Sequence, residues 1–312
     1  MLAKINTAIN NQFRTKNSSR TTPDNSYSAI RGVVLKFRKP LTQDTVSFGS
    51  SPLPKVAPPQ ITLQADTVKA LFGTLKNLSA EIVRQIKPYE PVLQKSGLKK
   101  ITTAFSEALN PKSEIFKESI GDLKFILEKD PALKEKDEKE ALAYQSLVIT
   151  FAHRVAHDFY KKGDTTIARF VSESAKKLTG AELHPGATIG KKVFIDHPTG
   201  LVVGEATKIG NRFHGHGNVI LGSDGVNAGK NRHPLIGENV TIWPHAKIHG
   251  NKTIGDGAVI GCNATVTENV PEHSVIVGHN ILAQLDGKKV KIHLKDYWDT
   301  LNGSSDINNL AV

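Results

Sequence analysis

Aliphatic residues recur at intervals of six through the C-terminal half of the chain. One run extends from Leu183 to Leu201 and a second from Ile236 to Val266, with no slip inside either run. A six-residue period is too short for a helical repeat and predicts a parallel β-helix, in which each repeat supplies one short strand and one turn. Three repeats would make one triangular coil, and the inward aliphatic side chains would stack from coil to coil into a continuous core.

The preceding segment has a helical periodicity instead. Between about residues 65 and 178, apolar side chains recur at helical spacing, as Leu71, Leu75 and Leu78 do. Breaks in this pattern fall at Pro88, Pro111, Pro131 and the Lys-Gly-Asp sequence at 162–164. We therefore expect five or six helices, the last of them capped by Gly180 before the first hexapeptide begins.

These patterns divide the chain into four segments and predict an α+β fold. Residues 63–180 form an all-α helical domain and residues 181–284 form the β-helix of hexapeptide repeats. The segment 1–62 is rich in Ser, Thr, Asn, Pro and basic residues, which predicts either a disordered extension or an organelle transit peptide. Residues 285–312 are expected to form a weakly ordered tail.

One interval within the predicted β-helix is broken. Fifteen residues separate Leu221 from Ile236, which we interpret as two repeats and an excursion of about three residues. The intervening sequence GSDGVNAGKNRHP is glycine-rich and polar, so it cannot pack inside a coil. We expect a loop outside the coil, and loops on rigid scaffolds often carry function.

Charge and cysteine content limit the partners and the compartment. The net charge of +11 is concentrated in residues 1–60, which hold nine Lys or Arg against two acidic residues. The remaining chain has no basic stripe interleaved with aromatic residues, so we expect no nucleic-acid partner. No stretch approaches the roughly 18 consecutive apolar residues of a membrane span. The single cysteine, Cys262, excludes an intramolecular disulfide and favours the cytoplasm, or a plastid or mitochondrion if the N-terminal segment is a transit peptide.

Polar residues stand in three places where the repeat does not require them. These places hold Glu182 with His184, Asp196 with His197, and Arg232 with His233. His197 follows the inward Ile195 by two, which places it at a coil corner, where an imidazole is suited to take a proton near neutral pH. Glu182 lies nearly one coil below, so its carboxylate could orient that imidazole. Ordinary surface histidines remain the alternative interpretation.

The order of several motifs resembles the serine O-acetyltransferase family. HPGATIG comes first, IDHPTGLVVGEATKIG follows, and a glycine-rich loop ends in RHP, while the preceding helical segment contains DPA at 130–132 and AHRVAH at 152–157. The resemblance covers about residues 126 to 280. It implies a left-handed β-helix and the transfer of an acetyl group from acetyl-CoA to the hydroxyl of L-serine, a step of cysteine biosynthesis.

The resemblance also implies a role for each candidate residue. His197 would be the general base, and Glu182 would orient it, although the family usually has Asp at that position. Arg232 would hold the serine carboxylate through its planar guanidinium fork. The remaining substrate-binding candidates are Asp130 and Asp196 for the ammonium group and His233 beside the hydroxyl.

Acetyl-CoA would lie along the coils as a co-substrate, and no metal is expected. The candidate residues for its groove are Gly222, Ser223, Gly229, Ala246, Lys288 and Lys289. At 243–245 this sequence has Trp-Pro-His where the family tends to have small residues, so these side chains either reshape the groove or face outward at a corner.

The resemblance implies a homotrimer or a dimer of trimers, with active sites between adjacent β-helices. It also implies docking of the C-terminus into cysteine synthase through a terminal isoleucine, whereas this sequence ends in Asn-Leu-Ala-Val.

Three other functions remain open. A different hexapeptide acyltransferase would use a sugar or another amino acid as acceptor. A γ-type carbonic anhydrase would bind zinc through histidines, and a non-catalytic scaffold would retain only the fold. The available histidines for zinc are His214, His216, His245 and His249.

Overall fold

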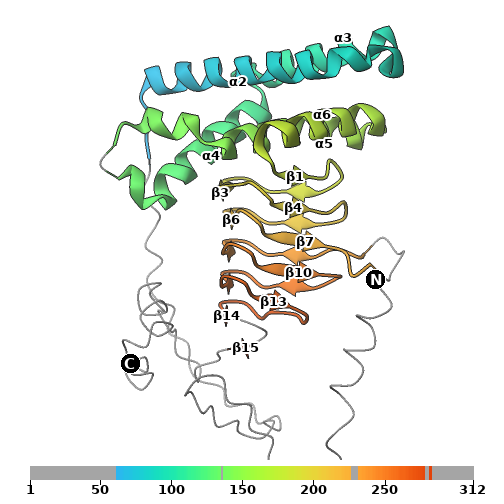
Figure 1. Ribbon diagram of the computed structural model, residues 1–312. Coiled ribbons are helices and arrows are strands. Elements are labelled where there is room, and N and C mark those ends of the chain that lie inside the picture. Colours follow the sequence, from blue (N-terminus) through green and yellow to red (C-terminus); the bar gives the residue numbers. More distant parts are fainter. Residues whose placement is uncertain (1–60, 135, 226–230, 278–280, 283–312) are drawn as a thin grey trace, which may run out of the picture. The chain divides into compact units, whose positions relative to one another are not determined.

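The computed structural model describes residues 61–134, 136–225, 231–277 and 281–282 (Figure 1). The predicted N-terminal extension, apart from its last two residues, and the predicted C-terminal tail lie outside these residues. The described residues belong to one compact unit, Pro58–Val312. None of its described helices is long and apolar enough to cross a membrane.

Within the described residues, five α-helices precede the β-helix, in agreement with the expected five or six. They are α2 (Ala65–Ile86), α3 (Glu90–Ala108), α4 (Glu114–Lys129), α5 (Gln145–Lys161) and α6 (Thr165–Thr179). Short 3₁₀ helices occupy Lys87–Tyr89, Pro131–Leu133 and Glu138–Ala143. Gly180 caps α6 in the left-handed conformation, with φ of 70°, which confirms the expected glycine cap.

Short strands then wind into a coil with three sheets (Figure 1). The first sheet contains β1 (Glu182–Leu183), β4 (Val202–Val203), β7 (Ile220–Gly222), β10 (Lys247–His249) and β13 (Thr265–Val266). The second contains β2 (Thr188–Ile189), β5 (Lys208–Ile209), β8 (Leu235–Ile236) and β11 (Thr253–Ile254). The third contains β3 (Phe194–Asp196), β6 (His214–His216), β9 (Thr241–Ile242), β12 (Val259–Ile260), β14 (Val275–Val277) and β15 (Ile281–Leu282). All named pairings are parallel except the final pair, β14 with β15, so the predicted parallel β-helix is confirmed.

The hydrophobic repeat builds the interior of this coil. Positions of the second run, such as Ile242, Ile248 and Ile254, are fully buried, and they fall in successive strands at intervals of six. The small residues that follow, such as Ala258 and Ala264, are buried as well. Residues at the six-residue interval are therefore both strand residues and core residues, as expected for stacked repeats.

The expectation of an uninterrupted first run is wrong. Leu183 pairs with Val203, not with Leu201, so the first coil is two residues longer than three hexapeptides. The additional residues lie at the corner between β3 and β4, which contains His197 and Gly200. Leu201 is nevertheless buried, because it fills the small-residue position before the strand. The six-residue spacing from Ile195 to Leu201 is therefore a coincidence, because two inserted residues separate Leu201 from the strand position that it was expected to occupy.

The division of the glycine-rich interval is also wrong. Leu221 lies in β7 of the first sheet and Ile236 in β8 of the second, which are consecutive repeats. Six residues would connect these positions, so nine of the fifteen leave the coil instead of three. The expected loop is confirmed, although residues 226–230 are outside the described part of the chain.

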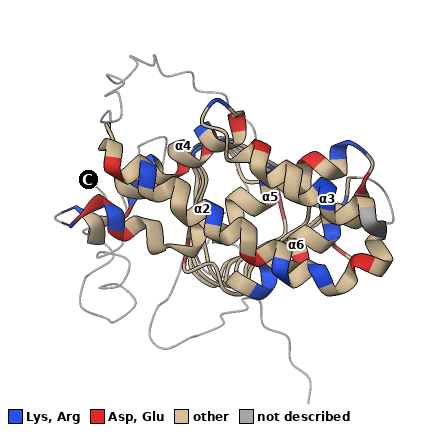
Figure 2. Ribbon diagram, turned by 90° about the horizontal axis from the view of Figure 1, so that it is seen from above, with Lys and Arg blue, Asp and Glu red and all other residues tan. Residues whose placement is uncertain are grey.

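The helices lie together over the β1 end of the coil, with α5 and α6 between it and α2 (Figures 1 and 2). Ile195 of β3 donates its backbone N–H to Oγ of Ser146, at 2.9 Å, and Val193 donates to Oδ1 of Asp122, also at 2.9 Å. Asp122 in turn accepts two hydrogen bonds from the buried guanidinium of Arg154, at 2.6 and 3.0 Å. These buried contacts hold α4 and α5 against the strand that ends at Asp196.

Candidate active site

A histidine and an aspartate stand together where β3 ends. His197 follows the strand with φ of 47°, a left-handed conformation, and its side chain is 92 % exposed. Its Nε2 lies 3.5 Å from Oδ1 of Asp196. The predicted corner position of His197 is therefore confirmed, and the two-residue insertion projects the ring out of the coil.

Two further groups gather beside Asp196. The hydroxyl of Tyr144 donates to Oδ2 of Asp130 at 2.6 Å, while Oδ1 of Asp130 accepts the N–H of Ala132 at 2.8 Å. Burial, followed by the hydrogen bond to Asp130, raises the pKa of Tyr144 above its ordinary value, and the charge of Asp196 adds to this effect. The structure thus brings the two predicted ammonium-binding aspartates to one tyrosine.

His214 and His216 complete this group, which we call the Asp196 group. Strand pairing places His214 beneath Phe194 and His216 beneath Asp196. Nε2 of His216 lies 3.9 Å from Oδ2 of Asp196, and the ring of His214 stacks on Phe194 with centroids 4.8 Å apart. The acetyltransferase interpretation gave these histidines no role. The sequence HGHG could have predicted that the two histidines lie together, because alternate residues of a strand share one face.

A second cluster lies at the corner between the first and second sheets, and we call it the Glu205 group. Tyr160 of α5 donates its hydroxyl to Oε1 of Glu205 at 2.8 Å, and Nη2 of Arg232 lies 3.7 Å from Oε2 of the same carboxylate. The ring of His184 packs edge-on against Tyr160, with centroids 5.9 Å apart. The hydrogen bond from Tyr160 lowers the pKa of Glu205, so this carboxylate stays ionised.

His233 belongs to the same group. Its side chain is buried, its Nδ1 accepts the backbone N–H of Ala206 at 3.3 Å, and its ring lies against the backbone of Gly204. Burial lowers the pKa of His233, so the ring is neutral near pH 7. A cavity of about 780 Å³ adjoins these groups, with Tyr160, His184 and Glu205 in its wall.

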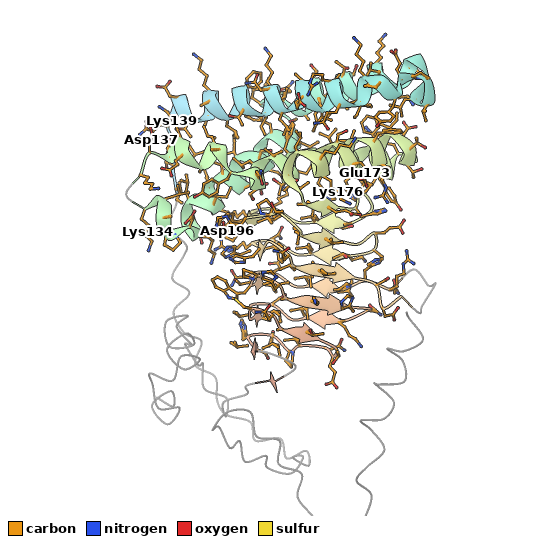
Figure 3. The ribbon with its side chains drawn as sticks, in the orientation of Figure 1. Lys134, Asp137, Lys139, Glu173, Lys176 and Asp196 are labelled. Carbon is orange, nitrogen blue, oxygen red and sulfur yellow. The ribbon has the colours of Figure 1, made fainter. Side chains whose placement is uncertain are left out.

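The expected contact between Glu182 and His197 is not made within the described chain. Glu182 instead pairs with Nζ of Lys176 at 2.5 Å and lies 3.9 Å from Nη1 of Arg169, both on α6. Lys176 and Asp196 lie on opposite sides of the first coil (Figure 3). The separation of fifteen residues suggested that the two side chains lie one above the other. Glu182 begins β1 of the first sheet, whereas His197 lies at the corner that follows β3 of the third sheet.

The coenzyme candidates fall in three situations. Gly229, Lys288 and Lys289 lie outside the described residues. Ala246 is fully buried in the coil, and Gly222 lies beneath the ring of His249. The backbone oxygen of Ser223 accepts a hydrogen bond from Nδ1 of His249 at 3.3 Å.

Of the bulky residues at 243–245, His245 takes the expected outward position at a corner, and an effect of Trp243 on the coenzyme groove stays a prediction. Trp243 stacks on His216 with ring centroids 4.6 Å apart, whereas His245 is exposed at a corner with φ of 64°. Within the described residues, the group able to hold a metal ion comprises Asp196, His214 and His216. It does not include His245 or His249, so the histidine set considered for a carbonic anhydrase does not converge there.

Comparisons with known proteins identify similar sequences and folds. The family described as bacterial transferase hexapeptide (six repeats) matches residues 233–268. A serine acetyltransferase of Bacillus pumilus is 40 % identical over 171 residues, which cover 54 % of this chain and 77 % of the relative. The crystal structure of Neisseria gonorrhoeae serine acetyltransferase aligns with a TM-score of 0.60 at 28 % identity, over 76 % of this chain and 84 % of that one. Its complex with serine aligns with a TM-score of 0.58 at 30 % identity, over 69 % and 83 % of the two chains.

Proposed function

We propose, from the premise that this chain belongs to the serine acetyltransferase family, that it transfers the acetyl group of acetyl-CoA to the hydroxyl of L-serine. The observation that carries the proposal is the exposed His197 beside the Asp196 carboxylate, at 3.5 Å. An exposed imidazole with a carboxylate on one ring nitrogen is the arrangement of a general base with its orienting partner.

His197 would take the proton from the serine hydroxyl with the ring nitrogen that faces away from Asp196. The serine oxygen then attacks the thioester carbonyl, the tetrahedral intermediate collapses, and the departing CoA thiolate takes the proton back from the imidazolium. Asp196 orients the ring within one chain, because it is the carboxylate beside that ring. Glu182 pairs with Lys176 instead, so we propose Asp196 in its place as the orienting carboxylate.

The charges of the site match a zwitterionic amino acid. Asp130 and Asp196 offer negative charge to the ammonium group, and Arg232 offers a guanidinium fork to the carboxylate. His233, neutral and held against Gly204, would contact the hydroxyl side of the substrate. A sugar acceptor has no carboxylate for Arg232 to hold, which favours serine over the sugar alternative.

The two groups lie at different corners of the coil, which supports a shared site. The Asp196 group follows the third sheet and precedes the first, whereas the Glu205 group follows the first and precedes the second. Parallel β-helices arranged around a symmetry axis would bring one corner of each copy against a different corner of the next. We therefore propose a homotrimer in which each site takes the Asp196 group from one copy and the Glu205 group from another.

Release of free CoA from acetyl-CoA tests the proposal. We expect rapid release with L-serine, and little with D-serine, L-alanine or a panel of sugars, since these lack the correctly placed hydroxyl or the paired charges. Equal release with a sugar and with L-serine would contradict the proposed acceptor. Binding of acetyl-CoA along the coils, docking to cysteine synthase and a cytoplasmic location remain predictions with separate tests.

A further inference from the structure

We propose that Asp196, His214 and His216 form a binding site for a divalent transition-metal ion, with Zn²⁺ as the probe. One ligand atom of each side chain lies within 4.8 Å of the others, and the three residues come from the adjacent strands β3 and β6. Two imidazoles and a carboxylate with an open fourth position are a ligand set typical of zinc and related metals. The site lies within a single chain.

The hydrogen bond of His216 prepares its second nitrogen for a metal. Nδ1 lies 2.9 Å from the carbonyl oxygen of Ile242, and a carbonyl can only accept, so Nδ1 carries the proton of the neutral ring. Nε2 then presents a lone pair to the Asp196 carboxylate at 3.9 Å. A lone pair and an anion repel each other unless a cation lies between them. A backbone carbonyl behind the ring is also the usual support of a metal-binding histidine.

His214 supplies an independent indication. Its Nε2 is buried and has no hydrogen-bond partner within the described residues, which is costly for a polar atom unless a ligand satisfies it.

The surroundings hold these side chains close to a bound geometry. Phe194 stacks on His214 at 4.8 Å, and Trp243 stacks on His216 at 4.6 Å, so both rings are confined by aromatic neighbours. Ligand atoms about 2.1 Å from a tetrahedral zinc ion stand roughly 3.4 Å apart. Small side-chain rotations suffice to bring atoms that are within 4.8 Å to that separation.

A metal at this position would occupy a carboxylate of the catalytic centre. Asp196 faces His197 through Oδ1 and His216 through Oδ2. If the proposed function holds, bound Zn²⁺ removes the negative charge that serine's ammonium group requires. We therefore expect Zn²⁺ to inhibit acetyl transfer competitively with serine, and this expectation alone depends on the proposed function.

Calorimetric titration of the metal-free, full-length protein with Zn²⁺ tests the site. We expect one ion per chain in the wild type and at least a 100-fold weaker affinity in His214→Phe and His216→Phe, which keep the aromatic stacking but remove a ligand. His245→Gln is the matched control, because that histidine is exposed and outside the group. Thermal unfolding of each metal-free variant establishes that it is folded, and Co²⁺ absorption of the wild type reports nitrogen and oxygen ligation without any variant.

Three results would overturn the metal site. They are the absence of Zn²⁺ binding to the wild type, unchanged binding in the folded His214→Phe and His216→Phe proteins, and equal weakening in His245→Gln. Zinc binding together with absent acetyl transfer to any acceptor would instead contradict the proposed function and leave the metal site supported.

Discussion

At the scale of single residues, the site depends on side chains that the coil exposes at its corners. His197 has a positive φ and a side chain that is 92 % exposed, while Asp196 beside it is held by its strand. In the proposed mechanism, exposure leaves one nitrogen of the ring accessible to a substrate, and the nearby carboxylate orients the ring. A base of this kind should contribute chiefly to the chemical step.

Replacing His197 by Asn should lower kcat for acetyl transfer by about 10²–10⁴, the usual contribution of a positioned general base. Asn is chosen because it tolerates the left-handed backbone at this corner, where φ is 47°. His273→Asn is the matched control, since His273 is also exposed with φ of 56°. Steady-state kinetics with saturating acetyl-CoA provide the measurement, and a wild-type kcat in His197→Asn would exclude this base.

Replacing Arg232 by Ala should raise the KM for serine while the KM for acetyl-CoA changes little. Loss of a charge-assisted pair worth about 2 kcal/mol corresponds to roughly a 30-fold rise. Arg232→Lys should restore the affinity only in part, because a point charge cannot reproduce the bidentate fork. If both KM values stay at the wild-type level, the loop that carries Arg232 has no role in serine binding.

At the scale of elements, the site lies where the hexapeptide repeat departs from its period. A two-residue insertion between β3 and β4 exposes His197, and the nine-residue excursion between β7 and β8 ends at Arg232 and His233. The regular run from Ile236 to Val266 supplies the core and the stacking surface. These irregular corners supply His197, Arg232 and His233 of the proposed site, as loops on a rigid scaffold often carry function.

Gly204→Ala tests how closely His233, at the end of the excursion, packs on the coil. A Cβ there would lie 2.1 Å from Cδ2 of His233 and would displace the ring. We expect kcat/KM for serine to fall by about 10²-fold, the effect of moving a site group by roughly 1 Å. Gly73→Ala in α2 is the control, because no atom lies within 4 Å of its added Cβ. An unchanged kcat/KM in a folded Gly204→Ala protein would show that the position of His233 is unimportant.

The buried histidine of α5 should make stability depend on pH. Burial lowers the pKa of His153 to about 3, so between that value and the ordinary 6.5 the unfolded chain binds the additional proton. The free energy of unfolding therefore falls as pH decreases below 6.5, by about 2 kcal/mol at pH 5 from this residue. Denaturant unfolding at pH 7 and pH 5 should show a correspondingly smaller pH effect in His153→Phe. An equal pH effect in both proteins would contradict this assignment.

At the scale of the whole molecule, the separation of the Asp196 group from the Glu205 group is decisive. The two groups lie at different corners of the coil, and each group holds part of the charge pattern that serine requires. The described helices cover the β1 end of the coil (Figure 1). Assembly should therefore complete the site.

Mixing two inactive variants tests this assembly. His197→Asn disables the Asp196 group and Arg232→Ala disables the Glu205 group, so a contact between different variants can rebuild one intact site. Random co-assembly at equal amounts should restore activity in about a quarter of the sites. Each variant expressed alone provides the control. Absence of recovery in co-expressed, trimeric protein would indicate that both groups act within one chain.

The amino-acid sequence by itself determined the local architecture. Periodicity predicted five or six helices followed by a β-helix, and Gly180 predicted the cap of α6. The position of His197 two residues after Ile195 predicted its placement at a corner. These features follow from the geometry of a few consecutive residues, such as 3.6 residues per helical turn or one strand per hexapeptide.

Only the tertiary structure decided which side chains meet. It paired Leu183 with Val203, placed Glu182 beside Lys176, and set His216 beneath Asp196. Each of these contacts depends on how many residues occupy a corner or on where a helix lies against the coil. A local pattern does not report these quantities, because an added corner residue shifts every later strand while leaving the hydrophobic alternation intact.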